Sequence, residues 1–133
     1  RGLIAGITRG TTAAHLARAT LEGIALSVAD IMGASEEDLG RPLSFLRVDG
    51  GASANRLLMQ LQADFSGREL IRPKFIETTA LGAAFLAGLA QGIWSDQEQL
   101  RKVWKKDAIF FPKMKEGLRE EWINRWKSAL QKA

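Results

Sequence analysis

A pair of glycines between an expected strand and an expected helix is the pattern in this sequence best suited to binding chemistry. Gly50 and Gly51 follow the largely apolar residues 43–48, and a helical pattern begins just beyond them. Ligands of open α/β sheets bind at such junctions, because glycine lets the backbone approach where any Cβ would obstruct it. Asn55 lies about one helical turn beyond Gly51, so its amide can face the same ligand. A tight turn without a ligand is the alternative, and the two glycines alone leave both interpretations open.

Other polar residues are weaker candidates for chemistry. Asp49 ends the expected strand, where a turn or helix-capping role fits better than that of a catalytic acid. His15 is the chain's one histidine, and we expect it to form hydrogen bonds within the fold. Glu22 and Asp30 lie on one expected helix, but no partner pattern makes them a catalytic dyad. We therefore assign no catalytic residue, and expect surface or packing roles for Glu22 and Asp30.

Composition narrows the class of protein. The 133 residues are 46% hydrophobic and 26% charged, as in a folded globular domain. The absence of cysteine excludes disulfides and zinc–thiolate sites, and with one histidine we expect no metal site. We find neither an apolar run long enough to cross a bilayer nor a signal-peptide pattern, so we expect a cytoplasmic protein that does not associate with membranes.

Charge is unevenly distributed along the chain. The net charge is +4, and residues 101–133 carry ten of the 19 Lys and Arg residues but four of the 15 Asp and Glu. A basic segment can bind nucleic acid. Here the basic residues are dispersed through an amphipathic pattern, so we expect a solvated helix face and no nucleic-acid partner.

Hydrophobic periodicity and capping signals predict alternating strands and helices. Strands are expected at residues 2–7, 43–48 and 70–71, with an extended segment at 109–112. An acidic surface loop or a frayed helix end is expected at 33–41. Helices are expected from Thr11 or Thr12 to Met32, from a Ser53 cap to Phe65, from Thr78 or Thr79 through the small residues up to Ala90, from Ser95 to Trp104 and from Met114 to Ala133.

This alternation predicts an α/β layer with parallel strands and a C-terminal helix. Three strands make a thin sheet, and the chain begins at Arg1 without an initiator methionine. We therefore expect a fragment of a larger protein. The terminal helix repeats apolar residues every four positions, which favours docking onto the parent's own core over a partner or membrane surface; these residues are Met114, Leu118, Trp122, Trp126 and Leu130.

Several separated motifs resemble one known family. Residues 2–7 (GLIAGI) and 15–22 (HLARATLE) are similar to the second signature of the FGGY carbohydrate kinases. Residues 6–12 (GITRGTT), 77–84 (ETTALGAA) and 86–90 (LAGLA) are more like the glycerol kinases of that family than their pentulose or gluconate relatives. Residues 48–52 with Asn55 resemble the adenosine motif of the actin and Hsp70 type of ATPase. The likeness covers nearly the whole chain and is weakest at residues 33–43 and 101–133.

The resemblance implies a partial actin-like ATPase (ribonuclease H-like) domain. Residues 1–133 would then be a C-terminal FGGY kinase domain that is incomplete at its N-terminal side. Gly51 would match the family's nucleotide-contacting glycine and Asn55 the asparagine beside adenine, while Gly50 would shape the same turn. The intact parent would transfer the ATP γ-phosphoryl to glycerol, with Mg²⁺ as cofactor, and would be a homo-oligomer.

The family's catalytic aspartate, glycerol-binding residues and phosphate loops lie upstream of this chain. We therefore expect glycerol to bind through the missing N-terminal domain, and this chain alone to be inactive. Two alternatives remain open. The parent could be another FGGY sugar kinase, or the chain could be a non-catalytic nucleotide-binding module of actin-like fold.

Overall fold

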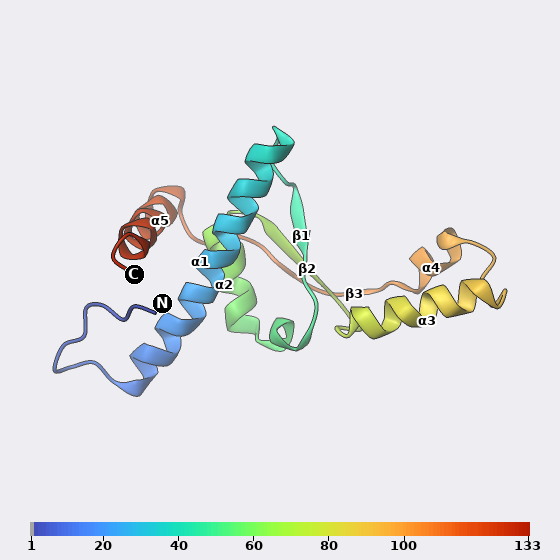
Figure 1. Ribbon diagram of the computed structural model, residues 1–133, viewed down its shortest axis with the longest axis horizontal. Helices are drawn as coiled ribbons and strands as arrows, with labels where there is room; N and C mark the ends of the chain where they lie inside the picture. Colours follow the sequence, from blue (N-terminus) through green and yellow to red (C-terminus); the bar gives the residue numbers. More distant parts are fainter. Residues whose placement is uncertain (1) are drawn as a thin grey trace.

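The computed structural model describes residues 2–133 and contains five α-helices and a small three-stranded sheet (Figure 1). One 3₁₀ helix, η1, precedes the second α-helix. The helices are α1 (Ala13–Leu39), η1 (Gly51–Ala54), α2 (Arg56–Ser66), α3 (Thr78–Ala90), α4 (Gln97–Val103) and α5 (Glu116–Leu130). This order confirms most of the predicted helices and their approximate positions.

Three strands form the sheet in the order β1-β2-β3. They are β1 (Phe45–Arg47), β2 (Glu69–Pro73) and β3 (Lys106–Phe110). The β1 and β2 strands are parallel and are connected through α2, as predicted. The β2 and β3 strands are antiparallel. The third strand was expected at residues 2–7, and the extended segment expected at 109–112 was not assigned to the sheet.

The antiparallel pairing follows from where the chain returns to the sheet. Pro73 at the end of β2 is paired with Lys106 at the start of β3. Directly beyond this pair, the Lys74 N–H donates to the Lys105 carbonyl at 2.8 Å. The α3 and α4 helices are inserted into what is otherwise a hairpin, and they project from this end of the sheet (Figure 1).

Helix α1 is longer than predicted and ends at Gly40. Gly40 adopts the left-handed conformation with φ 62°, which glycine tolerates without a steric cost. The expectation of an acidic surface loop or frayed end at residues 33–41 is therefore wrong for residues 33–39, which are helical. The acidic cluster did not end the helix, because Glu36 makes tertiary contacts that stabilise the last turns.

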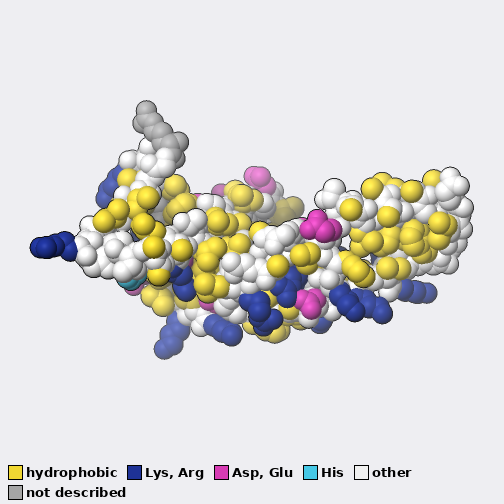
Figure 2. Space-filling view, turned by 90° about the horizontal axis from the view of Figure 1, so that it is seen from below, with side chains coloured by type: hydrophobic (Ala, Val, Ile, Leu, Met, Phe, Trp, Pro, Cys, Tyr) yellow, Lys and Arg dark blue, Asp and Glu magenta, His cyan; other side chains and the backbone are white. Residues whose placement is uncertain are grey.

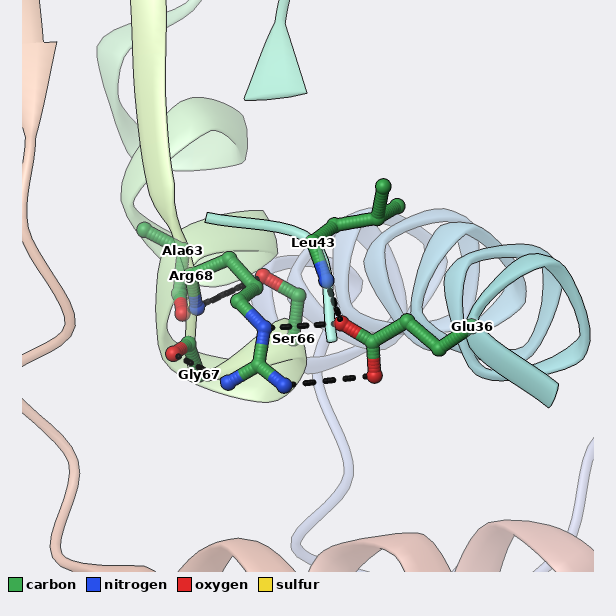
Figure 3. A network of polar contacts seen from close by, with 6 residues as sticks. All are labelled: Glu36, Leu43, Ala63, Ser66, Gly67 and Arg68. Atoms are coloured by element: carbon green, nitrogen blue, oxygen red, sulfur yellow. Dashed lines mark hydrogen bonds and ion pairs between the residues drawn. The ribbon is translucent and has the colours of Figure 1, made fainter. Parts of the chain in front are cut away.

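Glu36 links three separate segments, as Figure 3 shows. Its carboxylate accepts hydrogen bonds from the Leu43 N–H at 2.9 Å and from Arg68 Nε at 2.8 Å. Arg68 Nη2 reaches the second carboxylate oxygen at 3.2 Å. These bonds lower the pKa of Glu36, and the Arg68 hydrogen bond has the largest effect. The end of α1 is thereby fixed to the turn between α2 and β2.

The hydrophobic core lies where α2 packs against β2 and β3 on one side and α1 on another. Phe65 and Leu70 are almost fully buried at its centre. Gly67 ends α2 with φ 66°, as predicted from the sequence. The other buried core residues are Ala25, Leu26, Val48, Leu58, Met59, Leu61, Ala63 and Phe110.

Helix α5 docks onto this core, which confirms the predicted role of its apolar stripe. Met114, Trp122 and Trp126 pack against the core, and the Trp122 ring lies 5.8 Å from that of Phe65 between centroids. Leu118 and Leu130 stay exposed. The stripe is thus covered at Met114, Trp122 and Trp126 and exposed at Leu118 and Leu130.

Residues 2–7 do not form the predicted strand. Within residues 2–133, no backbone–backbone hydrogen bond involves this segment. Leu3, Ile4 and Ile7 are 42%, 68% and 61% exposed. A β-strand needs a neighbouring strand to satisfy its backbone groups, and the described sheet supplies none here.

The α3–α4 end of the molecule carries exposed apolar surface. Figure 2 shows hydrophobic side chains gathered over this end. Leu86 and Ile93 are exposed there, whereas Trp94 covers Gly88 and makes an edge contact with Phe85. Among the helices of residues 2–133, none combines the length and apolar character needed to cross a bilayer.

Candidate functional site: the glycine turn after β1

The Gly50–Gly51 turn follows the carboxyl end of β1, and a backbone hydrogen bond fixes its first residue. Gly50 has φ 75° and ψ 170°, a left-handed φ that side chains disfavour. Its N–H donates to the Ile76 carbonyl at 2.6 Å. Just before it, the Val48 N–H donates to the Ile71 carbonyl at 3.1 Å and extends the parallel pairing. This backbone conformation fits the expectation that Gly50 shapes the turn.

Gly51 begins η1 and is exposed, with open space in front of it. A Cβ built at Gly51 would meet no atom of residues 2–133 within 4 Å, apart from its immediate neighbours. The fold itself therefore does not require glycine at this position, whereas a ligand lying against the backbone would. This geometry fits the predicted close approach of a ligand.

Ser53 does not cap the next helix, contrary to the prediction. It is buried, and its hydroxyl donates to the Gly50 carbonyl at 2.7 Å, inside η1. The sequence pattern missed the 3₁₀ turn that separates the glycines from α2. Helix α2 consequently begins at Arg56, two residues later than a cap at Ser53 predicts.

Asn55 is the residue that caps α2. Its Oδ1 accepts from the backbone N–H groups of Leu57 and Leu58 at 3.0 and 3.1 Å. The side chain is exposed, and among residues 2–133 no protein acceptor faces its Nδ2. Asn55 thus has a structural role that the sequence analysis did not assign. Its Nδ2 stays free to donate to a ligand, so the predicted binding role is compatible with capping.

Among residues 2–133, the other polar candidates form no catalytic group. Asp49 is exposed in the turn but does not cap α2, so the capping alternative for it is wrong. His15 Nδ1 accepts from the Thr12 N–H at 3.1 Å, which confirms its predicted role within the fold. Glu22 pairs with Arg18 at 2.7 Å. Asp30 instead bonds to α5, so Glu22 and Asp30 serve different partners and form no dyad.

Sequence analysis missed Arg72, which lies behind the glycine turn. Its Nη1 donates to the Ser53 carbonyl at 2.8 Å, and its other nitrogens contact Asp107 on β3. The one sequence feature that could have drawn attention to Arg72 was its position at the carboxyl end of a strand, next to Pro73. That signal does not identify which carbonyls the side chain reaches.

The glycine turn forms an exposed surface and does not line a closed pocket. A hollow of about 720 Å³ lies between α1, α5 and the segment at residues 3–6, and the glycine turn does not line it. Among the described residues, no group of three or more His, Cys, Asp or Glu side chains could hold a metal ion. A ligand at Gly51 would therefore be covered by structure other than the turn itself.

A parallel βαβ unit with its glycine turn at the carboxyl end of β1 agrees with the partial actin-like ATPase domain that the resemblance implied. Comparison with solved structures supports this class. The chain superposes on Plasmodium falciparum glycerol kinase with ADP at a TM-score of 0.84 and 35% identity, over 96% of this chain and 26% of that one. Xylulose kinase from Lactobacillus acidophilus, at 22% identity and a TM-score of 0.73, shares the fold.

Sequence comparison then gives the family. Residues 1–91 match the FGGY family of carbohydrate kinases, C-terminal domain, and the chain belongs to this family. Glycerol kinase of Bdellovibrio bacteriovorus is 53% identical over 132 residues, which is 99% of this chain and 27% of that protein. Glycerol kinase 2 of Sulfolobus acidocaldarius is 50% identical over 133 residues, again 27% of that protein. The chain therefore spans about a quarter of the length of these relatives.

Proposed function

We propose that this chain is the nucleotide-binding C-terminal part of a glycerol kinase. The intact protein would transfer the γ-phosphoryl of ATP to glycerol and give sn-glycerol 3-phosphate and ADP. The observation that carries this proposal is identity of 50% or more, over essentially the whole chain, to bacterial and archaeal proteins named glycerol kinase. The parent would work in the cytoplasm, where ATP is available.

Gly51 and Asn55 would form one wall of the nucleotide site. The open space in front of Gly51 supports a backbone contact with ATP or ADP, because a nucleotide can occupy it without displacing protein atoms. The free Nδ2 of Asn55 supports a hydrogen bond to adenine, since adenine ring nitrogens are acceptors. Gly50 would shape the turn through its left-handed φ and would contact the nucleotide less directly.

The described residues support a binding role and not the chemical step. Phosphoryl transfer depends mainly on positioning and on neutralising charge at the phosphates. Mg²⁺ would supply part of that neutralisation and would be held by the nucleotide and by residues outside this chain, since residues 2–133 contain no cluster of three potential metal ligands. Glycerol would likewise bind to the remaining part of the parent, and this chain alone would be inactive.

ADP release by the intact protein tests the proposal. Glycerol, a pentulose and gluconate are supplied separately with MgATP. Turnover with glycerol alone supports a glycerol kinase, whereas turnover with another substrate keeps the nucleotide site and overturns the substrate. ADP binding without turnover on any of the three would favour a non-catalytic module. Light scattering of the same preparation tests the expected homo-oligomer.

A further inference from the structure

We propose that Arg72 is a positioning residue for the nucleotide, and that Asp107 holds Arg72 in place. Arg72 would act through the main chain of η1, without touching the ligand. The inference rests on the proposed function, because it takes Gly51 and Asn55 to be the ligand-contacting residues. It concerns how the fold keeps these two residues at a fixed orientation.

The guanidinium of Arg72 joins three segments that are distant in sequence. Nη1 donates to the carbonyl oxygens of Ser53 and Ala54 at 2.8 and 3.5 Å. Nε and Nη2 donate to Asp107 Oδ2 at 2.9 and 2.5 Å. The side chain is 11% exposed, and the guanidinium also lies 5.6 Å from the Phe110 ring centroid. The hydrogen bonds and the contact with Phe110 together fix both the position and the plane of the guanidinium.

The carbonyls that Arg72 reaches are those at the end of η1. A short helix leaves its last carbonyls without intrahelical partners, and a planar guanidinium can satisfy two of them together. Ala54 directly precedes Asn55, and Ser53 lies two residues beyond Gly51. Any rotation of this peptide segment would therefore move both proposed ligand contacts.

The turn is thus pinned at both ends. Gly50 is held to Ile76 by a 2.6 Å backbone bond, and the far end is held to the sheet by Arg72. The outward face, at Gly51, carries no such contact from the described chain. This arrangement is what a backbone-mediated site requires, because a preorganised main chain pays less ordering entropy when it binds.

Asp107 is half-exposed at 44%, and ion pairs of this exposure stabilise a fold weakly. The Arg72–Asp107 pair is therefore expected to affect ligand affinity more than folding. Arginine should also be needed for its geometry, since lysine offers a point charge and cannot bridge carbonyls and carboxylate in one plane.

The test uses the intact protein and four variants: Arg72→Gln, Arg72→Lys, Asp107→Asn and, as a matched control, Arg68→Gln. Arg68 is a half-buried arginine just before β2, and its pair with Glu36 does not involve the turn. We expect the two Arg72 variants to weaken ADP binding and raise the KM for ATP by about tenfold, the effect of losing one good interaction. The KM for glycerol should change by less than about twofold.

Asp107→Asn should give a smaller shift in the same direction, and Arg68→Gln should leave ADP affinity unchanged. Wild-type ADP affinity in Arg72→Lys and Asp107→Asn would overturn the inference. Equal rises in both KM values, together with a lowered Tm, would also overturn it and indicate a purely structural role. If Arg72→Gln does not fold, Arg72→Lys and Asp107→Asn still decide the question.

Failure of the proposed function is distinguishable from failure of this inference. An intact, folded wild-type protein that binds no ADP removes the nucleotide site altogether. A wild type that binds ADP, loses affinity with Gly51→Val and keeps it with the Arg72 variants leaves the proposed function standing. In that case only the positioning role of Arg72 is lost.

Discussion

The indole N–H of Trp126 donates a 2.6 Å hydrogen bond to Asp30 Oδ2, across 96 residues of sequence. This bond attaches the terminal helix α5 to α1 at Asp30. Trp126 also packs against the core beside Trp122, so one side chain contributes both apolar burial and a directional contact. The relationship explains why Asp30, a candidate for chemistry by its charge, has a structural role instead.

Trp126→Phe should lower stability while leaving nucleotide binding intact. The phenyl ring keeps part of the packing but cannot donate to Asp30, so we expect a loss of about 1 kcal/mol. The Tm of the intact protein, measured by calorimetry, checks this. Asp30→Asn is the matched variant, because it keeps an acceptor oxygen and should cost less. A loss of ADP affinity without a fall in Tm would contradict the structural role.

Gly51→Val should weaken ADP binding by at least about tenfold with little change in Tm. A Cβ at Gly51 would meet no atom of the described residues within 4 Å apart from its chain neighbours, so we expect the added side chain to obstruct a ligand and not the fold. Titration calorimetry with ADP and a thermal melt of the same sample measure both effects. Gly50→Ala is the contrasting variant. The left-handed φ of 75° at Gly50 should make that change cost about 1 kcal/mol of stability or more.

Unchanged ADP affinity in Gly51→Val would remove this residue from the nucleotide site. A large fall in Tm would instead show that the position has a folding constraint which the open space does not reveal.

Asn55→Asp separates the two roles of Asn55 better than Asn55→Ala does. Aspartate keeps the cap on Leu57 and Leu58, whereas alanine removes it and should cost about 1 kcal/mol of stability. Both variants lose the Nδ2 donor, so both should raise the KM for ATP more than that for glycerol. Steady-state kinetics on the intact protein measure this difference. A normal KM for ATP in Asn55→Asp would reduce Asn55 to a helix cap.

Glu36→Gln should remove a pH-dependent part of the stability. The Arg68 and Leu43 hydrogen bonds lower the pKa of Glu36 below its ordinary value of 4.5 in the folded state. The stabilisation is therefore fully present above about pH 4.5 and is lost as the pH falls through the lower folded pKa. The Tm difference between wild type and Glu36→Gln should be largest near neutral pH and should shrink in acid. A difference that grows on acidification would contradict this sign.

Much of the fold was predictable from local patterns. The helices α1, α2 and α5 follow from apolar periodicity and α3 from its threonine start and small residues, and Gly67 ends α2 as its position indicates. The parallel pair β1–β2 follows from the strand–helix–strand order. These features depend on interactions between near neighbours, which a single sequence displays directly.

The candidate site was predictable in outline and not in detail. The positions of Gly50 and Gly51 after a strand identified the turn, and the left-handed φ of Gly50 fits its expected role in shaping that turn. The nucleotide contacts at Gly51 and Asn55 stay a prediction. The 3₁₀ turn was not predicted, so the cap was assigned to Ser53 when it belongs to Asn55. A one-turn helix has too few residues to show a periodicity.

Sequence alone therefore determined the helices, the glycine turn and, by resemblance, the family of this protein. Tertiary structure decided that β3 runs antiparallel and that residues 2–7 stay unpaired. It also brought Arg72 to the Ser53 carbonyl, 19 residues away, and to Asp107, 35 residues away. The physical reason is the range of the interactions. Periodicity and φ preferences act within a few residues, whereas strand partners and buried hydrogen bonds depend on which distant segments the folded chain brings together.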